Sequence, residues 1–158
     1  MLSDLTIIKA GTGVLTKTSD GTIDRAALTY LVAAISALIN AGRRCVFVSS
    51  GAVGSGVSAL GLNEYPNDIE TRQACAAVGQ ARLMSTYNSL FSNFDISIAQ
   101  ILLTAEDIKT TERATNLMNT FGRLLREPRI LPIINENDSV AVEELRFGDN
   151  DKLSAEVA

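Results

Sequence analysis

Four short apolar segments, separated by segments with helical periodicity, constrain the fold of this chain most strongly. The apolar segments cover residues 5–8, 45–48, 96–103 and 130–134 and are rich in β-branched residues, which is typical of buried strands. Strands that are apolar throughout occur mainly in parallel sheets covered by helices on both faces. The sequence therefore predicts an α/β fold: a three-layer αβα domain around a mainly parallel sheet, with strands and helices alternating along the chain.

Three longer helices are predicted between these strands. The first extends from about residue 24 to residue 41, with apolar residues at the i, i+3, i+4 spacing of a buried helix face. The second covers residues 68–91, and the third covers residues 111–125. In the third helix, Met118 and Phe121 have helical spacing, and we expect both in the core.

Composition excludes several classes of function. The 158 residues include 14 basic and 18 acidic side chains, a net charge of -4, and no run of Lys or Arg forms the positive stripe that nucleic acids require. The longest nearly apolar stretch, residues 30–39, is too short to span a bilayer, and the first residues lack the basic flank of a secretion signal. We expect a cytoplasmic protein that binds neither nucleic acid nor membrane.

The cysteines and the missing histidine limit the chemistry further. Cys45 and Cys75 lie in apolar segments without metal-ligand spacing, and we expect both to be buried thiols, neither a disulfide nor a metal pair. The chain contains no histidine. Histidine-dependent triads and dyads and His-ligated zinc are therefore excluded.

Polar segments follow each predicted strand. They are residues 9–13 (Lys-Ala-Gly-Thr-Gly), residues 49–56, Thr104, and residues 135–138 (Asn-Glu-Asn-Asp). In a parallel sheet the ligand crevice lies outside the carboxyl ends of the strands. We therefore expect these segments to share one pocket for a small polar ligand, with a hairpin over residues 139–147 carrying a second polar cluster, residues 148–151, back over it.

Each glycine-rich segment has two possible roles. Residues 9–13 form either a simple tight turn or a phosphate cradle in which Lys9 supplies positive charge. Residues 50–56 either bind an anion through their N–H groups and the Ser50 hydroxyl, or allow close packing of a helix on the sheet. A nucleophilic Ser50 is disfavoured because no histidine is present to activate it.

Four motifs then occur in a fixed order along the chain. They are Lys9-x-Gly11-Thr12, Ser50-Gly51-Ala52, Asn135-Glu136-Asn137-Asp138 and Gly148-Asp149-Asn150-Asp151. In this combination the chain resembles the amino acid kinase family, and within it the branch that phosphorylates the side-chain carboxylate of glutamate. The resemblance implies that residues 1–158 are the N-terminal, amino-acid-binding part of the kinase domain. This part would not include the nucleotide-binding half.

The resemblance also implies a reaction. The γ-phosphoryl group of ATP, with Mg²⁺, would be transferred to L-glutamate as the first step of proline biosynthesis. Lys9 would be the catalytic residue and would contact the ATP phosphates together with Gly11 and Thr12. Proline is a possible feedback inhibitor, and the full-length protein is expected to be a homo-oligomer.

The resemblance places the amino acid substrate on the later motifs. We expect Asp138 to meet the substrate ammonium group. Ser50 and the N–H groups of Gly51 and Ala52 would meet a substrate carboxylate, and Asn150 would meet a second polar end. Which of Asp149 and Asp151 lies near Mg²⁺ stays open.

Two alternatives accompany this hypothesis. One is a fragment that binds glutamate or proline without catalysis. The other is a different amino acid kinase that acts on acetylglutamate, aspartate or carbamate.

Overall fold

The computed structural model describes residues 5–17, 22–140 and 153–155. In chain order the elements are β1 (Leu5–Lys9), α1 (Thr12–Leu15), α2 (Arg25–Asn40), β2 (Arg44–Val48), α3 (Ala52–Val57), α4 (Ile69–Phe91), the 3₁₀ helix η1 (Ser92–Phe94), β3 (Ser97–Leu103), α5 (Ala105–Lys109), α6 (Thr111–Leu124) and β4 (Ile130–Glu136). The four strands and the three longer helices lie where the sequence predicts them. The short helices α1, α3 and α5 are additional.

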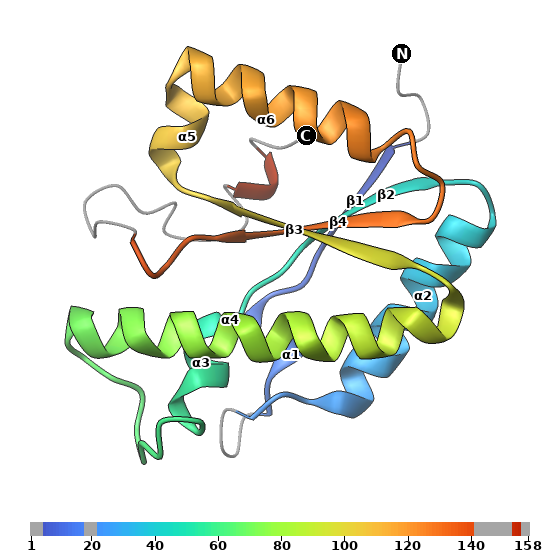
Figure 1. The fold of residues 1–158 in the computed structure, drawn as a ribbon. Helices are drawn as coiled ribbons and strands as arrows, with labels where there is room; N and C mark the ends of the chain where they lie inside the picture. The colour runs from blue at the N-terminus through green and yellow to red at the C-terminus, as the bar shows by residue number, and fades with distance from the viewer. Residues whose placement is uncertain (1–4, 18–21, 141–152, 156–158) are drawn as a thin grey trace.

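The strands form one sheet in the order β1-β2-β4-β3, and every neighbouring pair is parallel. Helices cover both faces: α1 to α4 lie on one side of the sheet and α5 and α6 on the other (Figure 1). The predicted three-layer αβα architecture is therefore confirmed. The connections leaving β2 and β3 run to opposite faces. The carboxyl end of β4, which lies between them in the sheet, is where such a sheet forms a ligand crevice.

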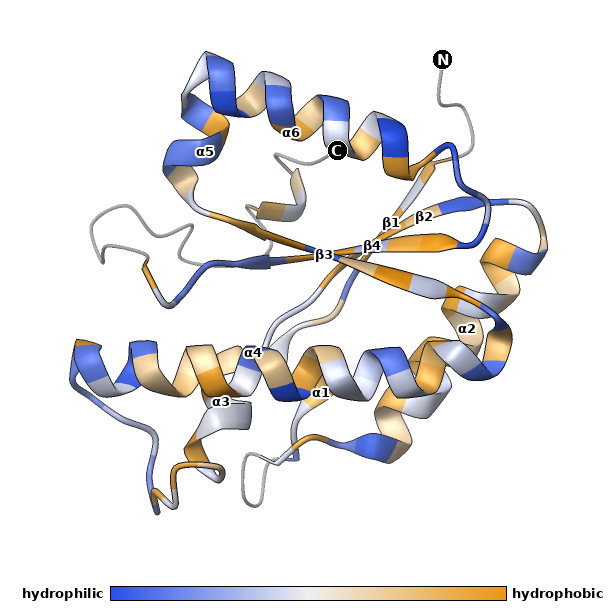
Figure 2. Ribbon diagram, in the orientation of Figure 1, coloured by the Kyte–Doolittle hydropathy of each residue, from blue (hydrophilic) through white to orange (hydrophobic). Residues whose placement is uncertain are grey.

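The core has a part on each face of the sheet. On the side of α2 and α4, fully buried aromatic and aliphatic residues such as Phe47, Tyr87 and Leu28 pack together. On the side of α5 and α6, Phe121 and Leu125 pack against Val46 and against other buried residues that include Leu153. Figure 2 shows the same division, with mainly hydrophobic strands between helices that alternate hydrophobic and hydrophilic residues.

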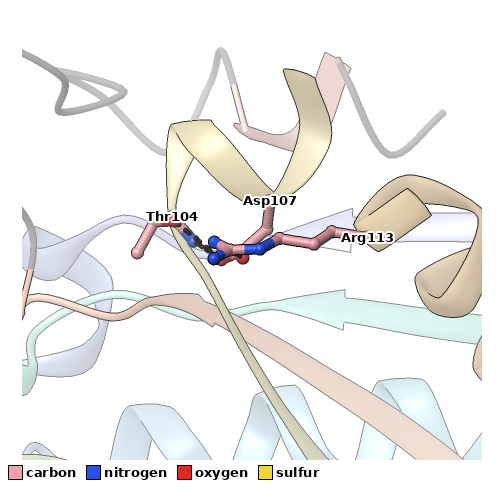
Figure 3. A network of polar contacts seen from close by, with 3 residues as sticks. All are labelled: Thr104, Asp107 and Arg113. Carbon is pink, nitrogen blue, oxygen red and sulfur yellow. Dashed lines mark hydrogen bonds and ion pairs between the residues drawn. The ribbon is translucent and has the colours of Figure 1, made fainter. Parts of the chain in front are cut away.

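Side-chain caps begin α2, α4 and α5. Asp24 accepts hydrogen bonds from the first-turn N–H groups of α2, and Asp68 accepts one from the Thr71 N–H in α4. At α5 the carboxylate of Asp107 accepts from both the N–H and the hydroxyl of Thr104, each at 2.7 Å (Figure 3). These bonds satisfy donors that a helix start leaves unpaired.

One core prediction is half wrong. Phe121 is buried, but Met118 on the same helix is 69% exposed. In α6 the covered stripe is narrow, so helical spacing alone does not place both residues against the sheet. Both cysteines are buried free thiols as predicted, and burial raises the pKa of each.

Two further predictions concern the polar cluster after β4 and membrane-spanning helices. The hairpin over residues 139–147 and the cluster at 148–151 fall almost wholly outside the described residues. Among the helices of the described segments, none is long and apolar enough to cross a membrane.

Candidate functional site

Backbone hydrogen bonds join the carboxyl ends of all four strands into one rim. The bonds run from Ala10 N to Val48 O (3.0 Å), from Ser49 N to Ile134 O (2.8 Å) and from Asn137 N to Leu103 O (2.8 Å). The strand register agrees, since Lys9 is level with Val48 and Val48 with Ile134. Neighbouring strands lie about 4.8 Å apart. Lys9 on β1 and the end of β4, two strands away, are therefore roughly 10 Å apart across the sheet. The polar segments after the strands thus gather at the same edge, as the sequence predicts.

The first two of these segments touch one another. Gly51 has φ +85°, a left-handed conformation that favours glycine, and a Cβ placed there would lie 3.9 Å from the methyl group of Thr12. The Lys9 amine folds back over its own loop, because a Cβ on Gly11 would lie 3.5 Å from Lys9 Nζ. The expected nucleotide residues and Gly51 therefore lie side by side.

One glycine on α3 and one on α4 have a packing role that the sequence suggested only in part. A Cβ on Gly56 would lie 2.0 Å from the Cys75 carbonyl oxygen, and one on Gly79 would lie 1.8 Å from the Ala52 carbonyl oxygen. The close contact is therefore between α3 and α4, not between a helix and the sheet. It brings α4 directly against the residue that begins α3.

A hollow of about 290 Å³ opens beside this contact. Its lining comes from the start of α3, the middle of α4, strand β3 and the segment after β4: Ala52, Ala76, Ala77, Gln80, Ala81, Gln100, Leu102, Glu136, Asn137, Asp138 and Ser139. Glu136 and Asp138 are the charged residues among these. A hollow with two carboxylates and several amides suits a small polar ligand that carries a positive group.

A hydrogen-bonded amide pair forms part of this site. The side-chain amide nitrogen of Asn135 donates to Oε1 of Gln80 at 2.9 Å, and Oδ1 of Asn135 accepts from the Glu136 N–H at 2.9 Å. Asn135 is only 2% exposed. These bonds connect α4 to the end of β4, and they give both ends of the buried Asn135 amide a hydrogen-bond partner.

A second buried pair supports the end of β2. The hydroxyl groups of Ser49 and Tyr87 lie 2.8 Å apart, and Tyr87 packs edge-on against Phe47. Burial raises the pKa of Tyr87 to about 12, although the hydrogen bond with Ser49 acts in the opposite direction. A neutral phenol therefore holds the strand end just before Ser50.

The predicted site residues divide into three groups. Ala52 and Asp138 line the hollow itself. Ser50 is 7% exposed and belongs, with Lys9 and Gly51, to the rim beside it. Asn150, Asp149 and Asp151 lie outside the described residues.

Sequence reasoning did not assign Gln80, Gln100 or Tyr87 to the site. Gln80 does carry a signal, because it is a single amide among small residues in the segment Ala-Ala-Val-Gly-Gln-Ala. Nothing local marks Tyr87, whose partner Ser49 is 38 positions away.

Comparison with known proteins gives consistent matches over nearly the whole chain. A sequence profile of the amino acid kinase family matches residues 4–158. A protein named glutamate 5-kinase from Carboxydothermus hydrogenoformans is 46% identical to this chain over 96% of its length. Another of that name, from Nostoc sp., is 48% identical over 99% of the chain. One from Clostridium acetobutylicum is 46% identical over 96% of the chain. The chain spans 41%, 42% and 56% of the length of these three relatives, respectively.

Proposed function

Because this chain belongs to the amino acid kinase family, we propose that the whole protein transfers the γ-phosphoryl group of ATP to the side-chain carboxylate of L-glutamate. The product would be L-glutamyl 5-phosphate, the first intermediate on the way to proline. The observation that carries this proposal is the single rim. Lys9 is the last residue of β1, and Ser50 and Asp138 come just after β2 and β4, whose carboxyl ends are joined to it by hydrogen bonds. One glutamate and the end of one nucleotide fit the roughly 10 Å between β1 and β4.

The chemistry suits a chain without histidine. A carboxylate nucleophile has a pKa near ~4.3 and is already ionised at neutral pH, so no general base is required. The reaction then depends on alignment of the two substrates and on neutralisation of phosphate charge. A rim of glycine N–H groups, hydroxyls and one lysine is the kind of site that supplies both.

We assign roles to these residues from the family resemblance, and their positions support the assignment. Lys9, Gly11 and Thr12 are proposed to bind the ATP phosphates, with the positive charge of the Lys9 amine stabilising the group in transfer. Asp138 is proposed to accept the substrate ammonium group at the hollow.

The remaining substrate contacts come from the start of α3 and from the later polar cluster. Ser50 and the N–H groups of Gly51 and Ala52 are proposed to bind a substrate carboxylate. Asn150 is proposed to bind a further polar group of the amino acid.

Mg²⁺ is expected together with ATP. In the part of the chain that the structure describes, no three metal-binding side chains form a cluster. Mg²⁺ is commonly held by one or two carboxylates and by substrate phosphates. Asp149 and Asp151 are the candidates for this role. The bound ion would neutralise charge on the phosphates.

The test is glutamate-dependent release of ADP by the whole protein, compared between wild type and Lys9→Ala. We expect the variant to lose at least a hundredfold in kcat while glutamate binding, measured by calorimetry, changes little. Arg44→Ala is the matched control, because it removes the same charge from the exposed start of β2 at the opposite edge of the sheet. Full activity of Lys9→Ala would refute its role, and glutamate binding by the wild type without any ADP release would favour an amino-acid-binding function alone.

Cytoplasmic location, feedback inhibition by proline and homo-oligomerisation are further proposals that follow from this function. Each is testable on the whole protein, the second by adding proline to the same ADP assay.

A further inference from the structure

The orientation of the Gln80 side chain follows from its neighbours. A backbone N–H can only donate, so the Asn135 atom that meets the Glu136 N–H at 2.9 Å must be its carbonyl oxygen. The other end of the Asn135 amide is then the NH₂ group, which donates to Gln80 at 2.9 Å. The Gln80 atom in that bond must be its carbonyl oxygen.

This orientation leaves the NH₂ group of Gln80 at the hollow. Gln80 lines the hollow, and none of the hydrogen bonds among the described residues engages its amide nitrogen. The close approach of the neighbouring Gly79 to Ala52 positions this turn of α4 at the start of α3. The side chain therefore presents two N–H donors of fixed orientation beside the proposed substrate.

The charge of the hollow indicates what these donors meet. Its charged lining residues are Glu136 and Asp138, which attract an ammonium group and repel a carboxylate. An α-amino acid carries both groups on one carbon, so its α-carboxylate must enter beside these acids. Neutral N–H donors are then needed to hold it.

We propose that Gln80 is a specificity-determining residue that donates a hydrogen bond to the α-carboxylate of the amino acid substrate. The proposal rests on the amino acid kinase function above and adds a residue that selects for a free α-carboxylate. Gln100 also lines the hollow, but it lies exposed on the edge strand β3, whereas Gln80 is held in place by the buried Asn135. Gln80 is therefore the better oriented donor.

The test compares two ligands and two variants of the whole protein by calorimetry. L-Glutamate and L-isoglutamine share the ammonium group and the side-chain carboxylate, but isoglutamine has a carboxamide in place of the α-carboxylate. In Gln80→Glu the new carboxylate still accepts from Asn135 but offers no donor. Gln73→Glu, two helical turns earlier on α4 and outside the lining of the hollow, is the matched control for the added charge.

We expect the wild type to prefer glutamate. Gln80→Glu should weaken glutamate binding ten- to a hundredfold, which is the range for a hydrogen bond to a charged group, while isoglutamine binding is kept or improved because its carboxamide can donate to Glu. Gln73→Glu should retain the wild-type preference. Gln80→Met, which neither donates nor adds charge, should also reduce the preference and serves if Gln80→Glu does not fold.

The outcomes separate the two proposals. Equal weakening of both ligands in Gln80→Glu, or an unchanged preference, would overturn the role of Gln80 while leaving the kinase function intact. A wild-type protein that neither binds nor phosphorylates glutamate would overturn the kinase function, and the role of Gln80 with it.

Discussion

The hydroxyl groups of Ser49 and Tyr87 meet 2.8 Å apart in the core, directly before Ser50 at the rim of the sheet. Tyr87 is completely buried on α4, and Ser49 is the first residue after β2. A buried hydroxyl without a partner is costly, and the Ser49 hydroxyl supplies the partner for the phenol of Tyr87. Their contact ties the long helix to the end of the strand.

Replacement of Tyr87 by Phe should therefore lower stability at neutral pH. The ring and its packing against Phe47 are kept, and the lost hydrogen bond should reduce the free energy of unfolding by about 1 kcal/mol. Urea unfolding followed by circular dichroism measures the difference. Tyr30→Phe is the control, because Tyr30 is 80% exposed and its hydroxyl can bond to water; an equal loss in both variants would contradict this role of the buried pair.

Ionisation of Tyr87 should also lower the stability of the protein at high pH. Burial raises the pKa of Tyr87 to about 12 in the folded protein, against about 10 when unfolded. Between these values the unfolded chain loses the proton and the folded protein keeps it, so the free energy of unfolding falls as pH rises, by about 2 to 3 kcal/mol in all. Denaturant titrations from pH 9 to pH 12 should show this fall in wild type and not in Tyr87→Phe, after subtraction of the losses common to both. Parallel curves would mean that Tyr87 ionises freely in the folded state.

The contact between α3 and α4 gives a third prediction. In Gly79→Ala the added methyl group would lie 1.8 Å from the Ala52 carbonyl oxygen, so the helices must separate. Overpacking of this kind costs about 1–3 kcal/mol, and the shift should also weaken ligand binding at the hollow. Gly122→Ala is the control: it lies on α6 with open space around it and should raise stability by up to about 1 kcal/mol through helix propensity. Thermal unfolding of both variants tests the contrast, and a stable Gly79→Ala would show that α3 can move without cost.

Much of this fold could be predicted from sequence because its signals are local. Apolar strands, helical periodicity and the caps Asp24 and Asp68 each depend on residues within a few positions of one another. The gathering of polar segments at one edge then follows from the rule for parallel sheets.

Other features depend on contacts between distant residues. That β4 lies between β2 and β3 is decided by packing across the whole chain. The hydrogen bond between Gln80 and Asn135 joins positions 55 apart. The prediction that Met118 is buried failed because helical spacing does not say how wide a stripe of α6 the sheet covers. Gln80 and Tyr87 were missed for the same reason, because a sequence motif does not show a contact with a distant residue.

Asp107 connects the start of α5 to α6, and its charge should matter for stability. Partial burial acts to raise its pKa, but hydrogen bonds from Thr104 and Arg113 outweigh that effect and hold the pKa below its usual value (Figure 3). The stabilisation is present above the unfolded pKa of about 3.9 and is lost as pH falls through the folded value. Asp107→Asn should therefore lower the free energy of unfolding by about 1 kcal/mol at pH 7, with the gap to wild type closing in acid. Glu106→Gln, an exposed neighbour, should change stability less, and a gap for Asp107→Asn that stays constant down to pH 3 would contradict the role of its charge.

Two residues one turn apart on α6 offer the last prediction. Phe121 is 8% exposed and packs in the core between α6 and the sheet, whereas Met118, one turn earlier, is 69% exposed. Phe121→Ala should lower the free energy of unfolding by about 3–5 kcal/mol, because it removes a buried ring and leaves a cavity. Met118→Ala should change it by less than about 0.5 kcal/mol, since an exposed side chain loses few contacts. Urea unfolding of the two variants of the whole protein measures both. A large loss in Met118→Ala would mean that other residues of the whole protein cover the Met118 side of α6.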